Sequence, residues 1–555
     1  MIGIIADPAE QEIVREFFEL FKTPWEFFRQ GRRYDVLLCA DDGTFDTTAK
    51  LVLVYSGRKT HFDDEQKIQV RGQRKQACML TYQGNGLPLY GETITFAEKG
   101  TCFLTDEVLK ECGAVLYASE DKVLARIGYD LFREVRRLLT VGQPAANSAL
   151  PALELHIALL RDLITGAGVP LVEIPARPDG FQFIACLTHD VDHPSIRRHK
   201  WDHTVFGFLY RAVVGSFVKL ILGQMPIENL LANWVAALKL PFVYMGLAKD
   251  FWSDFHDRYL ELEGDLPSTF FVIPFKDQAG RRADRPAPPF RASRYGAGDI
   301  QDTIGKLMAG GREVGLHGID SWLASANGSK ELEEIRRLTG ASEIGVRMHW
   351  LYFDERSPAM LETAGAAYDS TIGYNETVGY RSGTTQAFKP VGLRRMLELP
   401  MHVMDTALFY PDHLALSPRQ AKTTLGRMVD NAIHYGGVLT INWHDRSLAP
   451  ERLWGASYRE VVQDMKSRGA WFSTARQAIA WFEKRRSAVF ESDSAKPGST
   501  RAKVPCNSGE RIPGLRLRTY NAGNPVGMDA RRSANYLDSA IMESVETDVP
   551  SGTRS

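Results

Sequence analysis

Two acids and two histidines stand together in LTHDVDH, residues 187–193. Asp190 and Asp192 are two residues apart, so on an extended strand both carboxylates point to the same side. They follow directly on an apolar run, FQFIAC, of the kind that forms buried strands. A buried strand that ends on several ionisable groups is expected where parallel strands open onto an active site.

Three further strand-like segments also end on ionisable side chains. His317 lies in EVGLHG, Arg347 and His349 lie in GVRMHW, and His444 and Asp445 lie in INWHDR. The carboxyl ends of parallel strands converge on one side of an α/β fold. We therefore expect these side chains to meet the two acids at a single site.

This combination of two carboxylates, three imidazoles and one guanidinium suits metal-assisted hydrolysis. A carboxylate and imidazoles are suitable ligands for a divalent ion, with zinc as the expected metal. A second carboxylate can take a proton from water that the ion activates, and an imidazole can protonate the leaving group.

Alternating strands and helices are predicted to position these residues, which implies parallel strands with crossover helices, in an open sheet or a barrel. The predicted strands are FQFIACLT (181–188), STFFVIPF (268–275), EVGLHG (313–318), IGVRMHW (344–350), AAYDSTIG (366–373), MLELPMHVM (396–404) and GVLTINWH (437–444). Helices such as KELEEIRRLTG and SPAMLETAGA lie between them.

The chain is too long, at 555 residues, for a single core. We expect a small α/β domain over residues 1–145, with strands DVLLCA and KLVLVY and helix EQEIVREFFELF. A connector and helix follow over 146–180, and the catalytic domain covers 181–485 with a helical insertion at 196–262. Residues 486–555 lack apolar periodicity, so a disordered tail is expected that can be removed without loss of stability.

Composition indicates a globular protein without a nucleic-acid partner. The chain has 67 Lys and Arg against 68 Asp and Glu, a balance that gives no basic patch for nucleic acid. Its six cysteines include no CxxC pair and are expected to be reduced thiols. The N-terminus lacks the basic and apolar regions of a secretion signal, so a cytoplasmic location is expected.

The most apolar stretch, residues 204–222, contains Arg211 and Lys219. Those charges argue against a transmembrane span. A helix that packs against the protein is the favoured interpretation, and peripheral contact with a membrane surface is the alternative.

The motifs resemble those of the polysaccharide deacetylase family, which is carbohydrate esterase family 4 with its NodB homology domain. The resemblance is to a branch with THDVD and RxH motifs. It covers about 300 residues and implies a distorted (β/α) barrel. The landmarks, in family order, are Thr188 to Asp192, the STFF strand from Ser268 to Phe271, the E-x-G-x-H segment from Glu313 to His317, Gly345 to Arg347, Tyr368 to Ser370, and His444.

The resemblance implies a role for each matching residue. Asp190 would be the general base and Asp192 a metal ligand, with His317 as a second ligand. Arg347 would orient the base, and His444 would be the general acid. The implied reaction is metal-dependent removal of acetyl groups from N-acetylated sugars of a poly- or oligosaccharide, with O-acetylated sugars as the less favoured alternative. The implied partner is a carbohydrate substrate.

One departure from the family pattern leaves the third ligand open. The family usually has His-x-x-x-His, but the fourth residue after His317 is Ser321. Asp320, Ser321 and His349 are the candidates for the missing ligand. We favour His349 because it is expected to share a strand face with Arg347.

Two other functions remain open at this point. The missing histidine is compatible with a catalytically inactive sugar-binding or assembly protein of a polysaccharide locus. The absence of a recognisable signal peptide is compatible with a hydrolase of a small cytosolic amide, acting on a non-peptide C–N bond.

Three other sequence features are weaker candidates for chemistry. The acids of CADDG, residues 39–43, are expected to form a turn, and His199 and His203 to lie on a solvated helix face. Asp405 falls where the family has a residue that orients the acid.

Overall fold

The computed structural model describes residues 1–42, 48–97, 100–119, 121–223, 225–492, 500–505, 512–520, 536–541 and 543–544. Contacts within the chain divide it into two compact units. The first comprises Met1–Gly180, Ser382–Val391 and Ala480–Ser555, and the second comprises Phe181–Arg381 and Gly392–Ile479.

The first unit contains a mixed sheet with a parallel half and an antiparallel half. The parallel strands are, in spatial order, β2 (Trp25–Phe27), β1 (Ile2–Ile5), β3 (Val36–Cys39), β4 (Leu51–Tyr55) and β11 (Val123–Ile127). The antiparallel strands are β10 (Cys112–Ala118), β9 (Thr101–Asp106), β6 (Cys78–Tyr82), β7 (Asn85–Leu89), β8 (Thr93–Phe96) and β5 (Val70–Arg74). The helices are α1 (Gln11–Phe21), α2 (His61–Glu65), α3 (Leu131–Thr140) and α4 (Ala152–Gly166). The predicted helix over residues 10–21 and the strands DVLLCA and KLVLVY are all present, as α1, β3 and β4.

A disulfide joins two strands of this sheet. Cys102 on β9 and Cys112 on β10 are bonded, with their Cα atoms 5.7 Å apart. The expectation of six reduced thiols is wrong for this pair. Their spacing of ten residues gives no CxxC pattern, and only the antiparallel pairing of β9 with β10 brings the two sulfurs together.

Part of the segment expected to be a disordered tail is ordered in the structure. Strand β24 (Arg516–Tyr520) pairs antiparallel with β12 (Leu171–Glu173) and with β25 (Tyr536–Ala540). Tyr520 is buried, and its hydroxyl donates to Glu173 at 2.9 Å. The composition of residues 486–555 does not reveal β24, because this strand is stabilised by pairing with a segment more than 340 residues earlier in the chain. The other strands of this region are β22 (Val489–Ser492), β23 (Thr500–Pro505) and β26 (Glu543–Ser544).

The second unit is built on one parallel sheet, which confirms the expected α/β architecture. Its strands in spatial order are β18 (Leu397–Glu398), β17 (Tyr368–Asp369), β16 (Val346–Met348), β15 (Glu313–Gly318), β14 (Thr269–Val272), β13 (Phe183–Val191), β20 (Val438–Asn442) and β19 (Val403–Met404). The sequence analysis missed a further strand, β21 (Ala470–Ser473), which also pairs with β13.

This sheet is curved strongly enough to form a barrel. In a flat sheet β13 and β16 would lie about 14 Å apart, because neighbouring strands are spaced by about 4.8 Å. The side chain of Arg347 on β16 nevertheless donates from Nη1 to Thr188 Oγ1 on β13 at 2.6 Å. Arg347 therefore crosses the inside of a rolled sheet, as the expected distorted (β/α) barrel requires.

One peptide segment, residues 397–404, closes the barrel by pairing with one edge of the sheet at its start and with the other edge at its end. The predicted strand MLELPMHVM is instead two short strands, β18 and β19, interrupted around Pro400. Pro400 has no N–H to donate to a neighbouring strand. The backbone on either side bonds to both edges of the sheet, since Leu399 N donates to Asp369 O and His402 N donates to Thr440 O.

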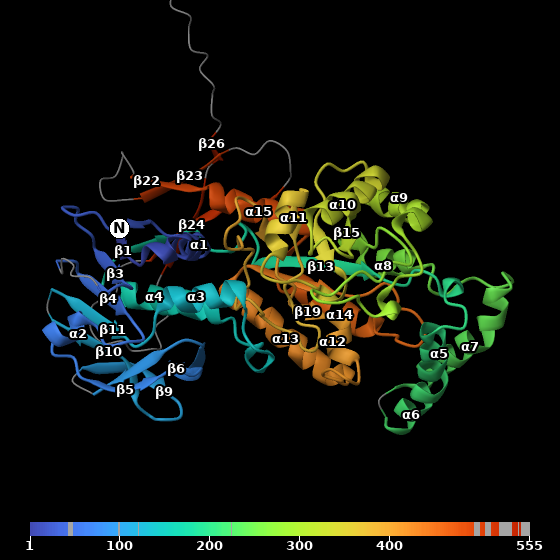
Figure 1. Cartoon of the computed structure of the whole chain (residues 1–555), viewed down its shortest axis with the longest axis horizontal. Helices are drawn as coiled ribbons and strands as arrows, with labels where there is room; N and C mark the ends of the chain where they lie inside the picture. The colour runs from blue at the N-terminus through green and yellow to red at the C-terminus, as the bar shows by residue number, and fades with distance from the viewer. Residues whose placement is uncertain are drawn as a thin grey trace, which may run out of the picture. The chain divides into compact units, whose positions relative to one another are not determined.

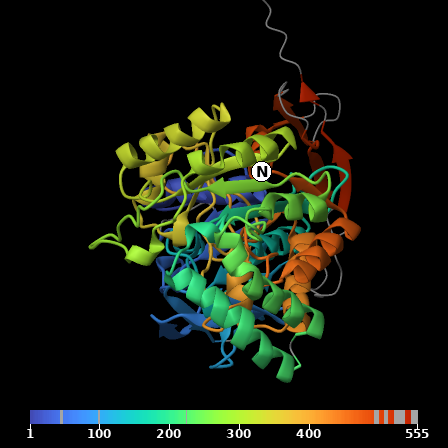
Figure 2. The same ribbon diagram turned by 90° about the vertical axis from the view of Figure 1, so that its right-hand side faces the viewer.

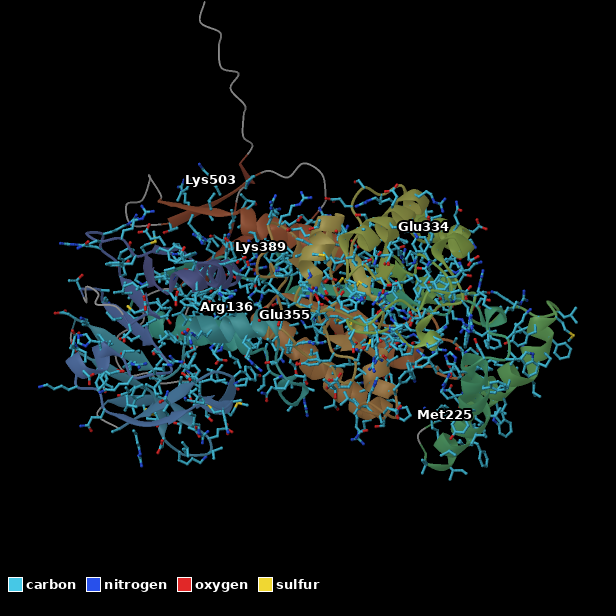
Figure 3. The ribbon with its side chains drawn as sticks, viewed as in Figure 1. Arg136, Met225, Glu334, Glu355, Lys389 and Lys503 are labelled. Carbon is cyan, nitrogen blue, oxygen red and sulfur yellow. A yellow bond between two sulfur atoms is a disulfide. The ribbon has the colours of Figure 1, made fainter. Side chains whose placement is uncertain are left out.

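Helices cover the outside of this sheet. Figure 1 shows β13 between α9, α10 and α11 on one side and α12, α13 and α14 on the other. The helices of this unit are α8 (Phe255–Glu263), α9 (Gln301–Ala309), α10 (Ser325–Thr339), α11 (Ser357–Ala364), α12 (Asp405–Phe409), α13 (Pro418–Tyr435) and α14 (Gly455–Ser467), and α15 (Ala475–Ser487) leads from it into the first unit. Glu334, labelled in Figure 3, lies on α10.

The insertion that separates β13 from β14 is helical. Helix α5 (His203–Leu209), a π-helical turn (Tyr210–Gly215) and α6 (Ser216–Ile221) form one continuous helix. It packs beside α7 (Ile227–Tyr244), and Figures 1 and 2 show the two helices as a hairpin.

Deleting residues 512–555 is expected to lower the melting temperature of the first unit by about 4–8 °C. The deletion removes the buried side chain of Tyr520, a loss of about 2 kcal/mol. Ending the chain after Tyr520 is the matched control, because it keeps β24, and it should cost far less. Calorimetry on both truncations makes the comparison. Equal melting temperatures for the full chain and the longer deletion would show that β24 contributes nothing.

Candidate metal centre

One cavity of about 670 Å³ receives the residues that the strand ends were expected to supply. It opens at the carboxyl ends of the parallel strands of the second unit. Its lining includes all three histidines and both acids of the predicted site, namely Asp190, Asp192, His317, His349 and His444.

Asp192, His317 and His349 could hold a metal ion together. One ligand atom from each residue lies within 4.8 Å of the other two. His317 Nε2 is 3.4 Å and His349 Nε2 is 3.6 Å from Asp192 Oδ1. These three residues form what we call the triad.

Hydrogen bonds orient the imidazole of His317 and hold the backbone at His349. His317 Nδ1 lies 3.0 Å from the backbone oxygen of Arg347, which accepts its proton and leaves the Nε2 lone pair free. Arg291 Nη2 donates to the backbone oxygen of His349 at 2.7 Å. Burial lowers the pKa of His349 well below its ordinary value, so its ring is neutral and can act as a ligand.

His349 reaches the triad by a different route from the one expected. Strand β16 ends at Met348, so His349 does not share a strand face with Arg347. It begins a short turn in which Trp350 and Leu351 both have left-handed backbones, with φ of 64° and 52°. This turn, rather than the strand, brings the imidazole of His349 to Asp192.

The other two candidates for the third ligand point elsewhere. Asp320 Oδ1 accepts a hydrogen bond from the backbone N–H of Arg281 at 2.8 Å. Ser321 is buried, and its hydroxyl donates to Glu331 at 2.5 Å. Both side chains are therefore engaged in holding the loop that follows β15.

The residues present fit a divalent cation. Asp192 Oδ1 is buried and accepts no hydrogen bond from the residues that the structure describes. A buried carboxylate oxygen is costly without a partner, and a cation would satisfy it. One carboxylate and two neutral imidazoles form the three-ligand set of a hydrolytic zinc site, which keeps a fourth position for water or substrate.

Asp190 is held by two donors inside the barrel. Arg347 Nη1 donates to its Oδ1 at 3.2 Å, and Asn442 Nδ2 donates to its Oδ2 at 2.8 Å. Asp190 Oδ2 also lies 4.0 Å from His317 Nε2, beside the triad. The sequence analysis missed Asn442, although a polar side chain two residues before His444 on an apolar strand indicates the same inward face.

His444 is held by Asp405 and is protonated. Its Nδ1 lies 2.6 Å from Asp405 Oδ1, and its backbone N–H donates to Asp405 Oδ2 at 2.8 Å. Burial lowers the pKa of His444, but Asp405 and the acids of the cavity outweigh this and raise it to about 10. The other ring nitrogen, Nε2, faces away from Asp405 and lies 3.8 Å from Asp192 Oδ2.

The remaining histidines of this region serve the structure around the site. His189 points to the outside of the barrel, where Nε2 meets Glu263 at 2.8 Å. His199 is buried between Asp202 and His193, so its expected place on a solvated face is wrong. His203 begins α5 and lines the cavity.

Asp445 and the acids of CADDG accept hydrogen bonds from the backbone. Asp445 accepts from the backbone N–H of His193 at 2.7 Å. In CADDG, Asp42 accepts from the backbone N–H of His61 at 2.7 Å, and Gly43 lies outside the described residues.

Replacing His349 with alanine is expected to abolish stoichiometric zinc binding, because two protein ligands remain where three are needed. Asp320→Ala and Ser321→Ala should keep one zinc per chain. Metal content after dialysis, together with the visible spectrum of the cobalt-substituted protein, measures the difference. Loss of zinc in Asp320→Ala but not in His349→Ala would reassign the third ligand to the loop acid.

No family model and no curated protein matches the chain. Among solved structures, it is similar to a Mycobacterium smegmatis protein assigned as a polysaccharide deacetylase, at 17% identity and a TM-score of 0.34, covering 56% of this chain and 95% of the other. PuuE allantoinase is similar at 14% identity and a TM-score of 0.34, over 55% of this chain and 92% of its own. A CE4 family pseudoenzyme from Bacillus anthracis shares 13% identity at a TM-score of 0.24, over 41% of this chain and 60% of its own.

Proposed function

We propose that the chain is a metal-dependent hydrolase that removes acetyl groups from N-acetylated sugars of a poly- or oligosaccharide. One observation carries this proposal. A carboxylate held in place by two donors, Asp190, and an imidazole bonded to the Asp405 carboxylate, His444, flank the triad. A hydrolase of amides needs such a pair of base and acid around a metal.

Asp190 is the proposed general base. The donors Arg347 and Asn442 hold its two oxygens in place. Because the carboxylate lies beside His317, it can take a proton from a water molecule at the triad. Arg347 and Asn442 are positioning residues, since each touches Asp190 rather than the triad.

His444 is the proposed general acid. Asp405 binds its Nδ1, so the proton on Nε2 faces the cavity. There it can be passed to the nitrogen of the amine that departs from the acetyl group.

Asp192, His317 and His349 would hold the ion. A bound zinc would polarise the acetyl carbonyl and lower the pKa of water. Burial alone would raise the pKa of Asp192, but the three imidazoles around its carboxylate outweigh this and hold that pKa well below its ordinary value.

The rim of the cavity supports a sugar substrate. Trp350 lies with its ring centroid 5.6 Å from that of Phe290 and 6.1 Å from that of Tyr352. All three rings line the cavity, whose volume exceeds the needs of a small amide. Asp192, His317 and His349 supply the three possible ligands that the His-x-x-x-His pattern left incomplete, which favours an enzyme over an inactive protein.

Asp190→Asn and His444→Ala should each lower turnover by at least about a hundredfold, the usual contribution of a general base or acid. Zinc content and melting temperature should stay unchanged. Acetate release from N-acetylglucosamine oligomers is the assay, with a panel of small amides in parallel. His413→Ala, which alters another cavity histidine, is the control and should keep most activity. Near-normal turnover in either variant would remove that residue from the mechanism.

Asp405→Asn should shift the alkaline limb of the pH profile of kcat/KM to lower pH. The general acid must be protonated, so activity falls as pH rises through the pKa of His444. The Asp405 carboxylate raises that pKa, and the neutral amide cannot. An unchanged alkaline limb would show that another group sets it.

A further inference from the structure

The helical hairpin of the second unit, residues 203–244, exposes an unusual amount of apolar surface. Among the described residues, 27 large hydrophobic side chains are exposed, and 17 of them lie between Trp201 and Leu247. Leu238 is 76% exposed and Ile221 is 69% exposed. Isolated apolar residues on a surface need no explanation, whereas a continuous patch of this kind marks an interaction site.

The exposed residues form one stripe on each helix. On the first helix they are Phe206, Tyr210, Val213, Val214, Phe217, Val218, Ile221 and Leu222. On α7 they are Ile227, Leu231, Trp234, Val235, Leu238 and Phe242. Both sets recur at intervals of three and four residues, so each stripe runs along one side of its helix.

The hairpin already has an apolar core on its inner side, where Phe208 and Ala212 of the first helix cluster with Ala236 and Leu240 of α7. A polar contact adds to this packing, since the buried Asn233 donates to Ser216 Oγ at 2.8 Å. The exposed stripes are therefore a second apolar face, outside the core that holds the two helices together.

The hairpin and its flanks are basic, although the chain as a whole is not. Residues 197–249 contain seven Lys and Arg and two Asp and Glu, in a chain with a net charge of -1. Lys200, Lys219 and Lys239 have no carboxylate within 4.0 Å among the residues described. Lys200 and Lys239 are exposed, so their charges are available to an external anionic surface, whereas Lys219 is half-buried.

The stripe begins at the rim of the cavity that holds the triad. His203, the first residue of α5, lines the cavity, and its ring lies 5.8 Å from that of Phe290. Phe290 in turn contacts Trp350 on the rim. A surface that binds the hairpin would therefore lie close to the cavity mouth.

We propose that the hairpin docks on the surface of an anionic lipid bilayer, with its apolar stripes in the headgroup region and its lysines on the lipid phosphates. A basic helix with an apolar face of this kind binds in the plane of a membrane. A second copy of the chain fits less well, because two hairpins with the same excess of positive charge would repel each other.

Docking on the surface fits the hairpin better than a span. The stretch His203–Ile221 has the length and composition to cross a membrane, with a mean hydropathy of 1.5. Arg211, in the middle of it, forms an ion pair with Glu451 on the body of the unit, which anchors that helix to the protein. Figure 3 labels Met225 in the turn that joins the two helices.

Flotation of the full chain with vesicles tests the proposal. Vesicles of phosphatidylcholine with about one third phosphatidylglycerol should carry the protein upward at low salt, and pure phosphatidylcholine should carry much less. Lys200→Glu with Lys239→Glu should weaken binding to the anionic vesicles by about thirtyfold or more. Ile221→Ser with Leu238→Ser should weaken binding to both kinds of vesicle by at least about tenfold.

Matched variants outside the hairpin control for general changes in charge and hydrophobicity. Val108→Ser with Leu109→Ser alters exposed apolar residues of the first unit, and Lys306→Glu reverses a charge on α9. Neither should change flotation. Brominated lipids should quench the emission of Trp201 and Trp234, and the quenching should disappear in Trp201→Phe with Trp234→Phe.

Two outcomes would overturn the proposal. One is equal flotation of the hairpin variants and the unaltered chain. The other is a dimer in sedimentation velocity that Ile221→Ser with Leu238→Ser dissolves, which would assign the stripe to a second copy. Acetate release from soluble oligomers should be the same in all hairpin variants, so a failure of docking and a failure of the proposed reaction are told apart.

Discussion

The guanidinium of Arg347 lies buried inside the rolled sheet, where it bonds to residues of β13 and to the segment that follows β17. It donates to Thr188 Oγ1, to Asp190 Oδ1 and to the backbone oxygen and hydroxyl of Ser370. A buried cation is tolerable only when its donors are satisfied, so these strands must curve toward it. The curvature of the barrel and the position of the general base thus follow from the same set of hydrogen bonds.

Hydrogen bonds from the backbone and from neighbouring side chains also hold the residues in and around the triad before any ion is present. The Arg347 carbonyl orients His317, the Arg291 guanidinium holds the turn at His349, and Asp405 fixes His444. Hydrolytic metal sites depend on such outer partners for ligand orientation and basicity. A site of this design loses little entropy on binding its ion, because its side chains are already ordered.

Much of this site was predictable because parallel strands deliver their carboxyl ends to one place. Asp190, His317 and His444 each follow an apolar run, and that local pattern was enough to group them. Partners that act across the fold leave no such local pattern. The pairing of β24 with β12 depends on segments far apart along the chain and could not be inferred from nearby residues. The split at Pro400 did have a local signal, because proline has no N–H to donate to a neighbouring strand.

The left-handed turn at Trp350 and Leu351 has a consequence for attempts to stabilise the protein. Neither residue is glycine, and each such conformation costs on the order of 1–3 kcal/mol. Glycine at either position would relieve that strain and is the substitution that a screen for thermostability would select. Glycine would also make the turn that places His349 beside Asp192 more flexible. Selection for heat resistance alone would therefore favour a variant in which the geometry of the triad is lost.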